Sequence, residues 1–400
     1  MARIDGRASL LIVTPYYASH GGGVERVAAR LADGLARLGW KIIWLASRDD
    51  RVANSEHSDA LWRACPVDAW NEVEKRTGVP FPVWGFRALC RLWTATGKSD
   101  IVVVHESLYV SSMFAVVVAR LRGRPVVLVQ HVDAVPYKQL MLRALMVAGN
   151  ATWTRVVHAL VVRILYISQN VMRHFEGPSC SKKGVLVPNG VDVEFFSEKN
   201  RSDCSGRTLS RPKLLFVGRF VEKKGLDIVE KLARARPDLD FAIAGDGPIR
   251  PEKWRLPNVQ LLGRLDQSAL AEQYWAADFL LLPSHGEGFP LVVQEAMAAG
   301  IAPLVSSETA RALPGVEKHV YSAPVSRDTP DLIETWSRLI DAALVAEKDD
   351  ERAIARVEFV RDNWSWERCV DSHDKLLREA QEGGGGSRRS RKVLDEDRPI

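Results

Sequence analysis

The chain has 400 residues, 46% of them apolar and 26% charged, and its formal net charge is +5. Four hundred residues exceed what one core usually supports, so two domains are expected. No uncharged apolar run reaches the 18 residues of a membrane-spanning helix, and the first residues do not resemble a secretory signal. The five cysteines form no CxxC pair. This spacing argues against a zinc site and favours a reducing, cytoplasmic location.

In the first half of the chain, short apolar runs alternate with helical patterns. Strands are expected at residues 10–14, 41–46, 101–104, 126–129, 162–167 and 185–187. A glycine-rich turn at 21–23 and an amphipathic helix at 24–38 separate the first two strands. Such alternation predicts a parallel sheet with helices on both faces.

Residues 197–212 interrupt this pattern, because they are polar and without periodicity, as in a linker. The alternation then resumes, with strands at 213–217, 241–244, 259–262, 279–282 and 302–305 and helices at 225–236, 267–276 and 291–299. The sequence therefore predicts an α/β protein of two Rossmann-like domains, 1–192 and 193–364, which face each other across a cleft. The glycine-rich tail 383–400 is expected to be disordered.

The most informative segment is 280–306, LLLPSHGEGFPLVVQEAMAAGIAPLVS. A strand is followed by a glycine-containing loop and then by a helix that begins near Pro290. The free N–H groups and positive dipole end of such a helix suit a diphosphate. Glu287 lies in the loop and Glu295 eight residues later, within an apolar helix. A carboxylate there needs polar partners, and sugar or ribose hydroxyls would serve.

Two cations follow another predicted strand in the segment VGRFVEKKG. Arg219 lies just past the strand and Lys224 just before the next helix. Cations at the carboxyl ends of strands can neutralise a leaving diphosphate without a metal. An Asp-x-Asp sequence occurs at 238–240, but it precedes a strand and so falls at the opposite edge of the sheet. We therefore expect no catalytic metal and no cofactor.

Weaker candidates lie in turns after other strands. They are Gly22 and Gly23 in GGGVER, His105, His131, Gly247 in GDGP and Leu265. Glycines allow a close approach of the backbone to a ligand, and a backbone near Leu265 could meet a base. A histidine at a strand end is more often a structural residue.

Taken together, GGGVER, HVD, PNGVD, GRFVEKKG, GDGP and EGFPLVVQEAMAAG resemble the retaining glycosyltransferase family four, of GT-B fold. The resemblance implies that Arg219 and Lys224 hold the donor diphosphate, Glu287 the transferred sugar and Glu295 the ribose. It also implies that the backbone at Phe289, Pro290 and Leu291 lies near the phosphates, Leu265 by the base, Gly22 and Gly23 by donor and acceptor, and His131 close to the reacting centre.

The resemblance further implies that a final helix, about 365–380, crosses back onto the first domain, and that the leaving phosphate oxygen takes the acceptor's proton. One departure concerns 306–316, SSETARALPGV, which lacks the GG-containing turn of many members.

A basic region extends over residues 111–190, with ten Lys and Arg against two acidic residues. Two of its segments, 137–147 and 154–165, combine bulky apolar side chains with basic ones. Such helices can lie on an anionic membrane surface, which would place the protein at the inner face of the cell membrane. They can equally be core helices of the first domain.

The leading hypothesis is transfer of a hexose, of mannose or glucose type, from a UDP or GDP sugar to a glycan or polyprenyl-linked acceptor in polysaccharide or glycoconjugate biosynthesis. One alternative is a non-catalytic nucleotide-sugar or nucleic-acid binder of the same fold. Interleaved exposed aromatics, typical of a strand-binding groove, are absent from the basic region, so no nucleic acid is expected. The other alternative is a synthase with a soluble small acceptor. The sequence does not choose between UDP and GDP.

Overall fold

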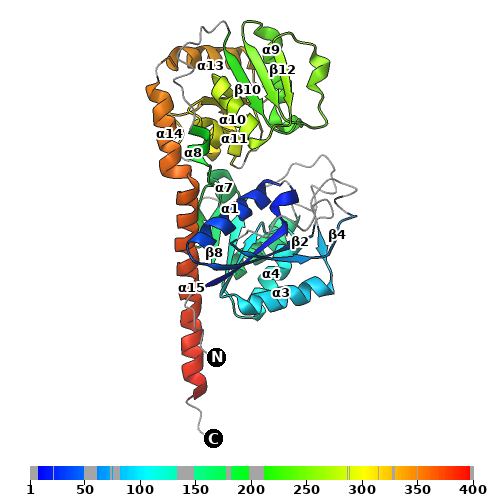
Figure 1. Ribbon diagram of the computed structural model, residues 1–400, viewed down its shortest axis with the longest axis vertical. Coiled ribbons are helices and arrows are strands. Elements are labelled where there is room, and N and C mark those ends of the chain that lie inside the picture. The colour runs from blue at the N-terminus through cyan, green and yellow to red at the C-terminus, as the bar shows by residue number, and fades with distance from the viewer. Residues whose placement is uncertain are drawn as a thin grey trace. The chain divides into compact units, whose positions relative to one another are not determined.

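The structure, a computed structural model, describes residues 8–20, 22–48, 61–72, 74, 82–132, 148–176, 182–197, 211–285, 287, 289–313, 315–326, 329–348 and 350–396. The chain forms two compact units (Figure 1). Unit 1 comprises Met1–Ile167, Val171–Pro188 and Cys369–Ile400. Unit 2 comprises Ser168–Asn170 and Asn189–Arg368.

Unit 1 is built on a seven-stranded parallel sheet in the order β3-β2-β1-β6-β7-β8-β9. The strands are β1 Ser9–Tyr16, β2 Lys41–Ser47, β3 Arg63–Val67, β6 Ile101–His105, β7 Val126–Gln130, β8 Arg163–Tyr166 and β9 Gly184–Leu186. The central strands β1, β6 and β7 are buried along their whole length. Continuous runs of branched aliphatic residues therefore mark them, as in sheets covered on both faces.

Helices connect these strands, and a short antiparallel pair of strands precedes α3. The helices are α1 Gly23–Arg37, α3 Phe86–Lys98, α4 Val110–Leu121, α6 Arg155–Leu160 and α7 Gln169–Glu176. The short pair is β4 Ala69–Trp70 and β5 Val83–Trp84. On one side of the sheet, α3 and α4 pack against each other. Their apolar side chains join those of β1, β6 and β7 in a single core.

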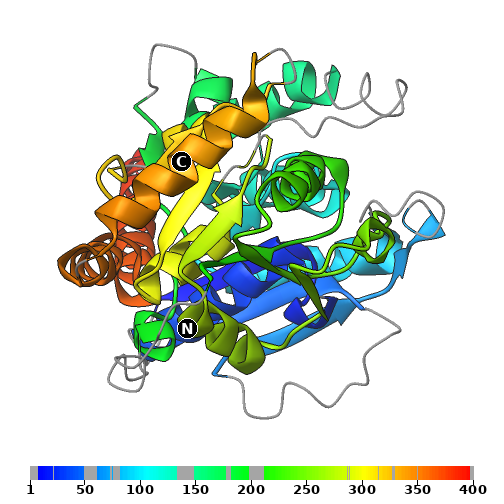
Figure 2. The same ribbon diagram turned by 90° about the horizontal axis from the view of Figure 1, so that it is seen from above.

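Unit 2 contains a six-stranded parallel sheet in the order β12-β11-β10-β13-β14-β15. The strands are β10 Lys213–Val217, β11 Asp240–Ala244, β12 Val259–Gly263, β13 Phe279–Leu282, β14 Ala302–Ser306 and β15 Tyr321–Ala323. The helices are α8 Val193–Ser197, α9 Leu226–Ala235, α10 Gln267–Ala276, α11 Leu291–Ala298, α12 Ser307–Ala312, α13 Leu332–Ala346 and α14 Glu351–Trp364. Helix α13 packs against α9 and β15, and it crosses the sheet in Figure 2.

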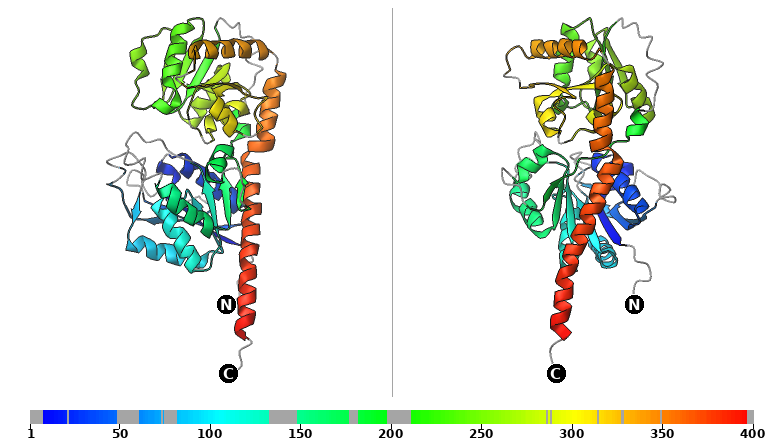
Figure 3. Two further views of the ribbon diagram at one scale, coloured as in Figure 1. Left: turned by 180° about the vertical axis from the view of Figure 1, so that it is seen from behind. Right: turned by 90° about the vertical axis from the view of Figure 1, so that its left-hand side faces the viewer.

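The last helix, α15 Trp366–Glu396, belongs to unit 1 from Cys369 onward and is the long red helix in Figure 3. It packs against α1, because a Cβ on Gly34 would collide with Val370. The indole of Trp40 donates to Asp374 at 2.6 Å, and the guanidinium of Arg378 lies 5.2 Å from the Trp40 ring. The end of the chain thus completes the first unit.

The expected fold class, two α/β domains with parallel sheets, is confirmed. Two local expectations were wrong. The segment 154–165 is not one helix, because α6 ends at Leu160 and β8 begins at Arg163 with its apolar side chains in the core. The tail expected to be disordered continues as helix to Glu396. The glycines of this segment disfavour a helix, so local propensity does not explain the continuation.

Residues 137–147, and all of the expected linker 197–212 except its ends, lie outside the described residues. The segment 306–316, which lacks the GG-containing turn, forms α12, and the Ser306 hydroxyl caps that helix by accepting from the Thr309 N–H. Among the described residues, no helix is both long and apolar enough to cross a membrane.

Candidate functional site

Each sheet contains one point where the strand order reverses. In unit 2 it lies between β10 and β13, and in unit 1 between β1 and β6. Open parallel sheets bind ligands at such points, outside the carboxyl ends of the strands, because the loops there diverge to opposite faces. The loops that follow these four strands carry most of the candidate residues. Arg219 and Lys224 follow β10, Glu287 follows β13, Gly22 and Gly23 follow β1, and His105 ends β6.

In unit 2, backbone contacts join the loops after β10 and β13. Gly225 adopts a left-handed conformation (φ +73°), and a Cβ there would collide with the carbonyl oxygen of Pro283. The N–H of His285 donates to the carbonyl of Lys223 at 2.7 Å. A residue other than glycine would be strained at position 225 and would separate the two loops. The glycine of the KKG sequence therefore holds Lys224 beside the loop that carries Glu287.

Lys224 and Glu287 form an ion pair, with Nζ and Oε1 2.7 Å apart. Their side chains are only 14% and 10% exposed. The attraction between two charges this close offsets the cost of shielding them from water, and each would be costly to leave there without the other. Arg219, near the start of the loop that carries Lys224, is exposed to solvent. One loop thus offers an anion a shielded ammonium group and an exposed guanidinium.

Glu295 lies on α11 and has a partner that the sequence did not indicate. The hydroxyl of Tyr274, on α10, donates to Glu295 Oε2 at 2.9 Å. Tyr274 is fully buried, and burial together with the negative charge of Glu295 raises the pKa of its phenol well above the ordinary value. The phenol therefore remains a donor at all physiological pH values and holds the half-buried carboxylate in place.

The backbone candidates of unit 2 lie in the loops after β11, β12 and β13. Pro290 caps the N-terminus of α11, and the Phe289 ring packs edge-on against Trp364 at 5.2 Å. Leu291, the first residue of that helix, is half-buried, as is Leu265 after β12. Gly247 packs directly on the backbone of Phe220, where a Cβ would collide. The glycine is therefore needed to pack the GDGP turn against the Arg219 loop.

In unit 1, Gly22 and Gly23 form the start of α1. Gly22 is its N-cap residue, and a Cβ at Gly22 would collide with the carboxylate of Glu25. Glu25 is only 3% exposed, and burial raises the pKa of its carboxyl. The glycine turn therefore admits a buried acidic side chain at the helix start, a role that the sequence did not indicate.

His131 follows β7 and is 6% exposed. Its Nε2 lies 3.0 Å from Nδ1 of His105, the last residue of β6, and the two rings stack with centroids 5.2 Å apart. Burial, assisted by the nearby His373, lowers the pKa of His131 to about 3. Burial also lowers the pKa of His105 well below its ordinary value. Both rings are therefore neutral at pH 7 and offer hydrogen bonds rather than charge.

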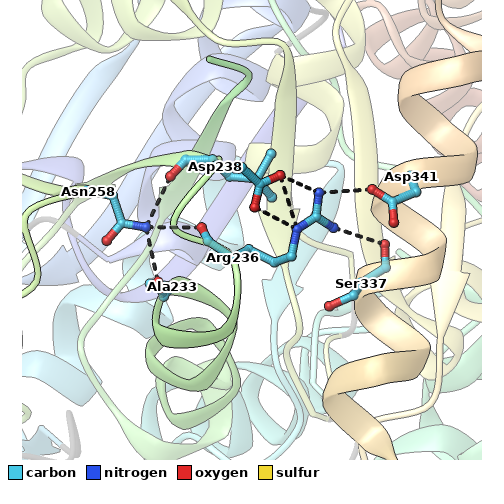
Figure 4. Close-up of polar contacts among 7 residues, drawn as sticks. Ala233, Arg236, Asp238, Asn258, Ser337 and Asp341 are labelled. Atoms are coloured by element: carbon cyan, nitrogen blue, oxygen red, sulfur yellow. Dashed lines mark hydrogen bonds and ion pairs between the residues drawn. The ribbon is translucent and has the colours of Figure 1, made fainter.

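The Asp-x-Asp sequence at 238–240 lies at the amino end of β11. Both of its carboxylates form ion pairs with arginines. Asp238 receives a bidentate contact from Arg236, with Nη2 and Oδ2 2.7 Å apart, and Arg236 also pairs with Asp341 of α13 at 2.9 Å (Figure 4). The hydrogen bond from Arg236 lowers the pKa of Asp238. Asp240 pairs with Arg211 at 3.7 Å. These contacts brace α13 against the sheet.

The neighbouring Asn258 holds the chain around Arg236 in place. Its amide donates to the carbonyls of Ala233, Arg236 and Leu239 (Figure 4). Among the residues that the structure describes, no cluster of three or more His, Cys, Asp or Glu could hold a metal ion.

Two family models match this chain. The glycosyltransferase family 4 model matches residues 21–195, and the model of group 1 glycosyl transferases matches 211–342. The chain belongs to glycosyltransferase family 4. This family-4 protein is a glycosyltransferase that transfers a hexose from a nucleotide sugar, as the sequence indicated.

Mycobacterial enzymes are among its relatives. The phosphatidyl-myo-inositol mannosyltransferase of Mycobacterium tuberculosis is 28% identical over 74% of this chain and 76% of its own length. A GDP-mannose-dependent alpha-mannosyltransferase of Mycolicibacterium smegmatis is 28% identical over 72% and 77%.

Solved structures share the GT-B fold of this glycosyltransferase. Anabaena HepE in complex with UDP superimposes with a TM-score of 0.69 at 14% identity, covering 93% of this chain and 100% of its own. The sucrose-phosphate synthase of Thermosynechococcus elongatus gives 0.66 at 18% identity, covering 93% and 99%. The expected fold is thereby confirmed.

The buried histidines of unit 1 predict acid-sensitive stability. Burial lowers the pKa of His131 to about 3 and that of His373 to about 4, whereas both titrate near 6.5 when unfolded. Between these values the unfolded chain binds more protons, so stability is complete above about pH 6.5 and falls as the pH drops towards 4. Each histidine contributes roughly 1.4 kcal/mol per pH unit across that window.

The fall in the melting temperature of unit 1 between pH 7 and pH 5 measures this effect. His373→Leu should reduce the fall, and the exposed His174→Gln serves as the matched control. An equal fall in wild type and His373→Leu would contradict the prediction.

Proposed function

We propose that this glycosyltransferase transfers mannose from GDP-mannose to a lipid-linked acceptor, with retention of configuration and without a metal. The mannosyltransferase names of its relatives support the sugar, and GDP-mannose-dependent relatives support the nucleotide. Relatives named for phosphatidyl-myo-inositol support an acceptor with a lipid anchor. The Lys224–Glu287 ion pair at the reversal point of the unit 2 sheet is the observation that carries the proposal.

The donor side of the proposal assigns each group by its chemistry. Lys224 and Arg219 bind the diphosphate, and Glu287 binds hydroxyls of the transferred sugar while it fixes Lys224. Glu295, oriented by Tyr274, accepts hydrogen bonds from the ribose. The N-terminus of α11 lies near the phosphates, with Phe289 and Pro290 before it and free N–H groups from Leu291 onward. Leu265 and Gly247 contribute backbone near the base and the diphosphate.

The chemistry requires stabilisation of the leaving group. As the bond between the sugar's anomeric carbon and the β-phosphate oxygen breaks, negative charge grows on that oxygen. Fixed cations beside it favour the transition state over the ground state. The acceptor oxygen attacks from the same face, and the leaving phosphate oxygen takes its proton. Gly22 and Gly23 border donor and acceptor in this scheme, and the neutral His131 offers a hydrogen bond close to the reacting carbon.

The two glutamates should separate binding from transfer. Glu287→Gln is expected to nearly abolish transfer but to leave GDP affinity largely unchanged, because its substrate partners are on the sugar and the Gln Oε1 can still accept a hydrogen bond from Lys224. Glu295→Ala should weaken GDP binding about ten- to a hundredfold, since a hydrogen bond to a charged group contributes roughly 1.5–3 kcal/mol. Tyr274→Phe should show part of the same loss. Calorimetric titration with GDP measures all three, and equal affinities of the Glu287 and Glu295 variants would disprove the division.

If Lys224 and Arg219 supply the charge, transfer from GDP-mannose should persist in EDTA without added Mg²⁺ or Mn²⁺. Lys224→Ala should lower kcat by about 10²–10³, the scale of single charge-stabilising donors, and should raise the donor KM less. Arg219→Lys should also be impaired, because an ammonium cannot reproduce a bidentate contact with phosphate. A panel of GDP-mannose, UDP-glucose and UDP-mannose donors identifies the nucleotide. Loss of activity in EDTA with recovery in Mn²⁺, and a near-normal Lys224→Ala enzyme, would overturn the assignment.

A membrane-facing surface is also part of the proposal, and its support comes from α3 and α4. On these helices Phe86, Trp93 and Leu121 are 80%, 45% and 72% exposed. The guanidinium of Arg122 lies 4.7 Å from the Trp93 ring and links the two helices. Neither 86–98 nor 110–124 contains an acidic residue, whereas together they contain six Lys and Arg. Exposed aromatics among basic side chains are suited to the interface of an anionic bilayer.

The surface of α3 and α4 should bind vesicles according to their charge. We expect flotation with phosphatidylglycerol-containing vesicles at low salt, and less with neutral vesicles or at high salt, because basic residues near the surface each contribute about 1 kcal/mol. Phe86→Ser combined with Trp93→Ser should weaken binding. Val345→Ser together with Ile354→Ser, at exposed apolar positions of unit 2, is the matched control. Binding that is absent, or that ignores lipid charge, would disprove the peripheral location.

A further inference from the structure

Two consecutive residues at the end of β6 both contact His131. His105 meets the His131 ring through the Nδ1–Nε2 contact of 3.0 Å. Glu106 accepts the backbone N–H of His131 through its carboxylate. The ring of His131 is therefore held by His105, the last residue of β6, and its backbone by Glu106, the residue that follows.

Glu106 is held in an unusual conformation. Its φ is +66°, in the left-handed region that residues with a Cβ seldom adopt, and it is 6% exposed. Such strain persists only where surrounding contacts impose it, and it is concentrated at functional sites. Here the contacts are visible. Its N–H donates to Val129 at 2.9 Å, and its carboxylate accepts from the N–H of Val132 at 2.8 Å and from the amide of Gln130 at 2.9 Å.

These bonds replace the sheet ladder where β7 ends. The N–H groups of His131 and Val132 lie beyond the last paired residue of β7, and a buried donor must find another acceptor. Oε1 of Glu106 accepts both of these N–H groups, and Oε2 accepts the side-chain amide of Gln130. A water-exposed loop would not need this arrangement. The strained turn thus fixes the direction in which the chain leaves β7 and hence the position of His131.

The ring contact determines which hydrogen bond His131 can offer. Both imidazoles are neutral, so a single proton lies between His105 Nδ1 and His131 Nε2. If His105 donates it, Nδ1 of His131 carries a proton and is a donor; if His131 donates, its Nδ1 is an acceptor. In either arrangement the contact with His105 sets the ring plane of His131 and couples its tautomer to that of His105.

A third histidine, from α15, restricts the pair further. His373 is buried, and its Nδ1 donates to the carbonyl of Cys369 at 2.8 Å, because a carbonyl can only accept. Its Nε2 is therefore unprotonated in the neutral ring, and this atom has no hydrogen-bond partner among the described residues. His373 interacts electrostatically with both His105 and His131. A fixed lone pair beside the two rings favours one arrangement of their protons over the other.

We propose that His105 and Glu106 are positioning residues that hold His131 in one orientation and one tautomer for sugar transfer. This inference rests on the proposed function, which places His131 close to the reacting carbon. Neither residue needs to touch the substrate. They act through His131, and an error of about 1 Å in a reacting group can lower a rate by about 10²-fold.

Substitutions at Glu106 separate positioning from a structural role. Glycine adopts φ +66° without strain but leaves the N–H groups of His131 and Val132 without their acceptor, so Glu106→Gly should stay folded with a lower melting temperature and should lower kcat about ten- to a hundredfold. Donor KM and GDP affinity should change less than about twofold, because the proposed nucleotide contacts come from other residues. Glu106→Gln retains one acceptor oxygen and should recover much of the rate.

At His105, His105→Leu should lower kcat similarly, and His105→Asn should recover part of it, because the Asn amide can occupy the position of Nδ1. The control is His158→Asn, since the His158 ring packs on Tyr166 and Phe175 instead. In a double-mutant cycle, Glu106→Gly combined with His131→Ala should be no slower than His131→Ala alone.

Long-range ¹⁵N–¹H spectra of the imidazoles supply a readout without turnover. Wild type should show a single neutral tautomer for His131, and His105→Leu should show a mixture. Unchanged kcat in folded Glu106→Gly and His105→Leu, additive losses with His131→Ala, or a His131 tautomer indifferent to His105 would each overturn the inference. A wild-type protein with one fixed His131 tautomer but no transfer from any donor would instead overturn the proposed function alone.

Discussion

The reversal of strand order in each sheet is the constraint on which the sites depend. Parallel strands bring all their carboxyl ends to one edge, and at the reversal two neighbouring strands send their chains to opposite faces. Between β10 and β13 this opens a place where the Lys224 loop and the Glu287 loop meet. Between β1 and β6 it brings the glycine turn of α1 to the edge that also carries His105. The candidate residues therefore come together because of the strand order of each sheet.

The two reversal points are equipped differently. In unit 2 the shielded Lys224–Glu287 pair and the exposed Arg219 provide charge suited to a diphosphate. In unit 1 the side chains around His131 are neutral imidazoles whose charged forms are disfavoured by burial. In the proposed scheme, the charged donor is bound by these cations, whereas His131, placed near the acceptor, supplies only directed hydrogen bonds. Hydrogen bonds depend on orientation. The strained conformation of Glu106 is therefore consistent with a need to hold the His131 side chain in one position.

The C-terminal helix connects fold and site. Its packing on α1 through Gly34 and Trp40 places His373 beside the histidine pair. A segment more than 200 residues away in sequence thus supplies part of the environment of His131. Truncation before α15 would remove both a packing surface and this neighbour.

The sequence by itself determined the alternation of strands and helices, and with it the fold class. Buried parallel strands are continuous apolar runs, so β10 and β13 were predicted with their observed bounds. The bounds of helix α10 were also predicted as observed. The sequence also indicated Arg219, Lys224, Glu287 and Glu295, because these charged residues follow strands or interrupt an apolar helix.

Only the tertiary structure decided which side chains meet. Tyr274 on α10 contacts Glu295 on α11, and Glu106 contacts the backbone of His131, although neither pair shows any sequence signal. The strain at Glu106 follows from bonds to a neighbouring strand, and local propensity contains no trace of it. The sequence predicted both a helix at 154–165 and a strand at 162–167, and pairing with β7 decided in favour of the strand from Arg163 onward. Contacts between distant segments depend on strand order, and strand order is a property of the folded sheet rather than of any local stretch of sequence.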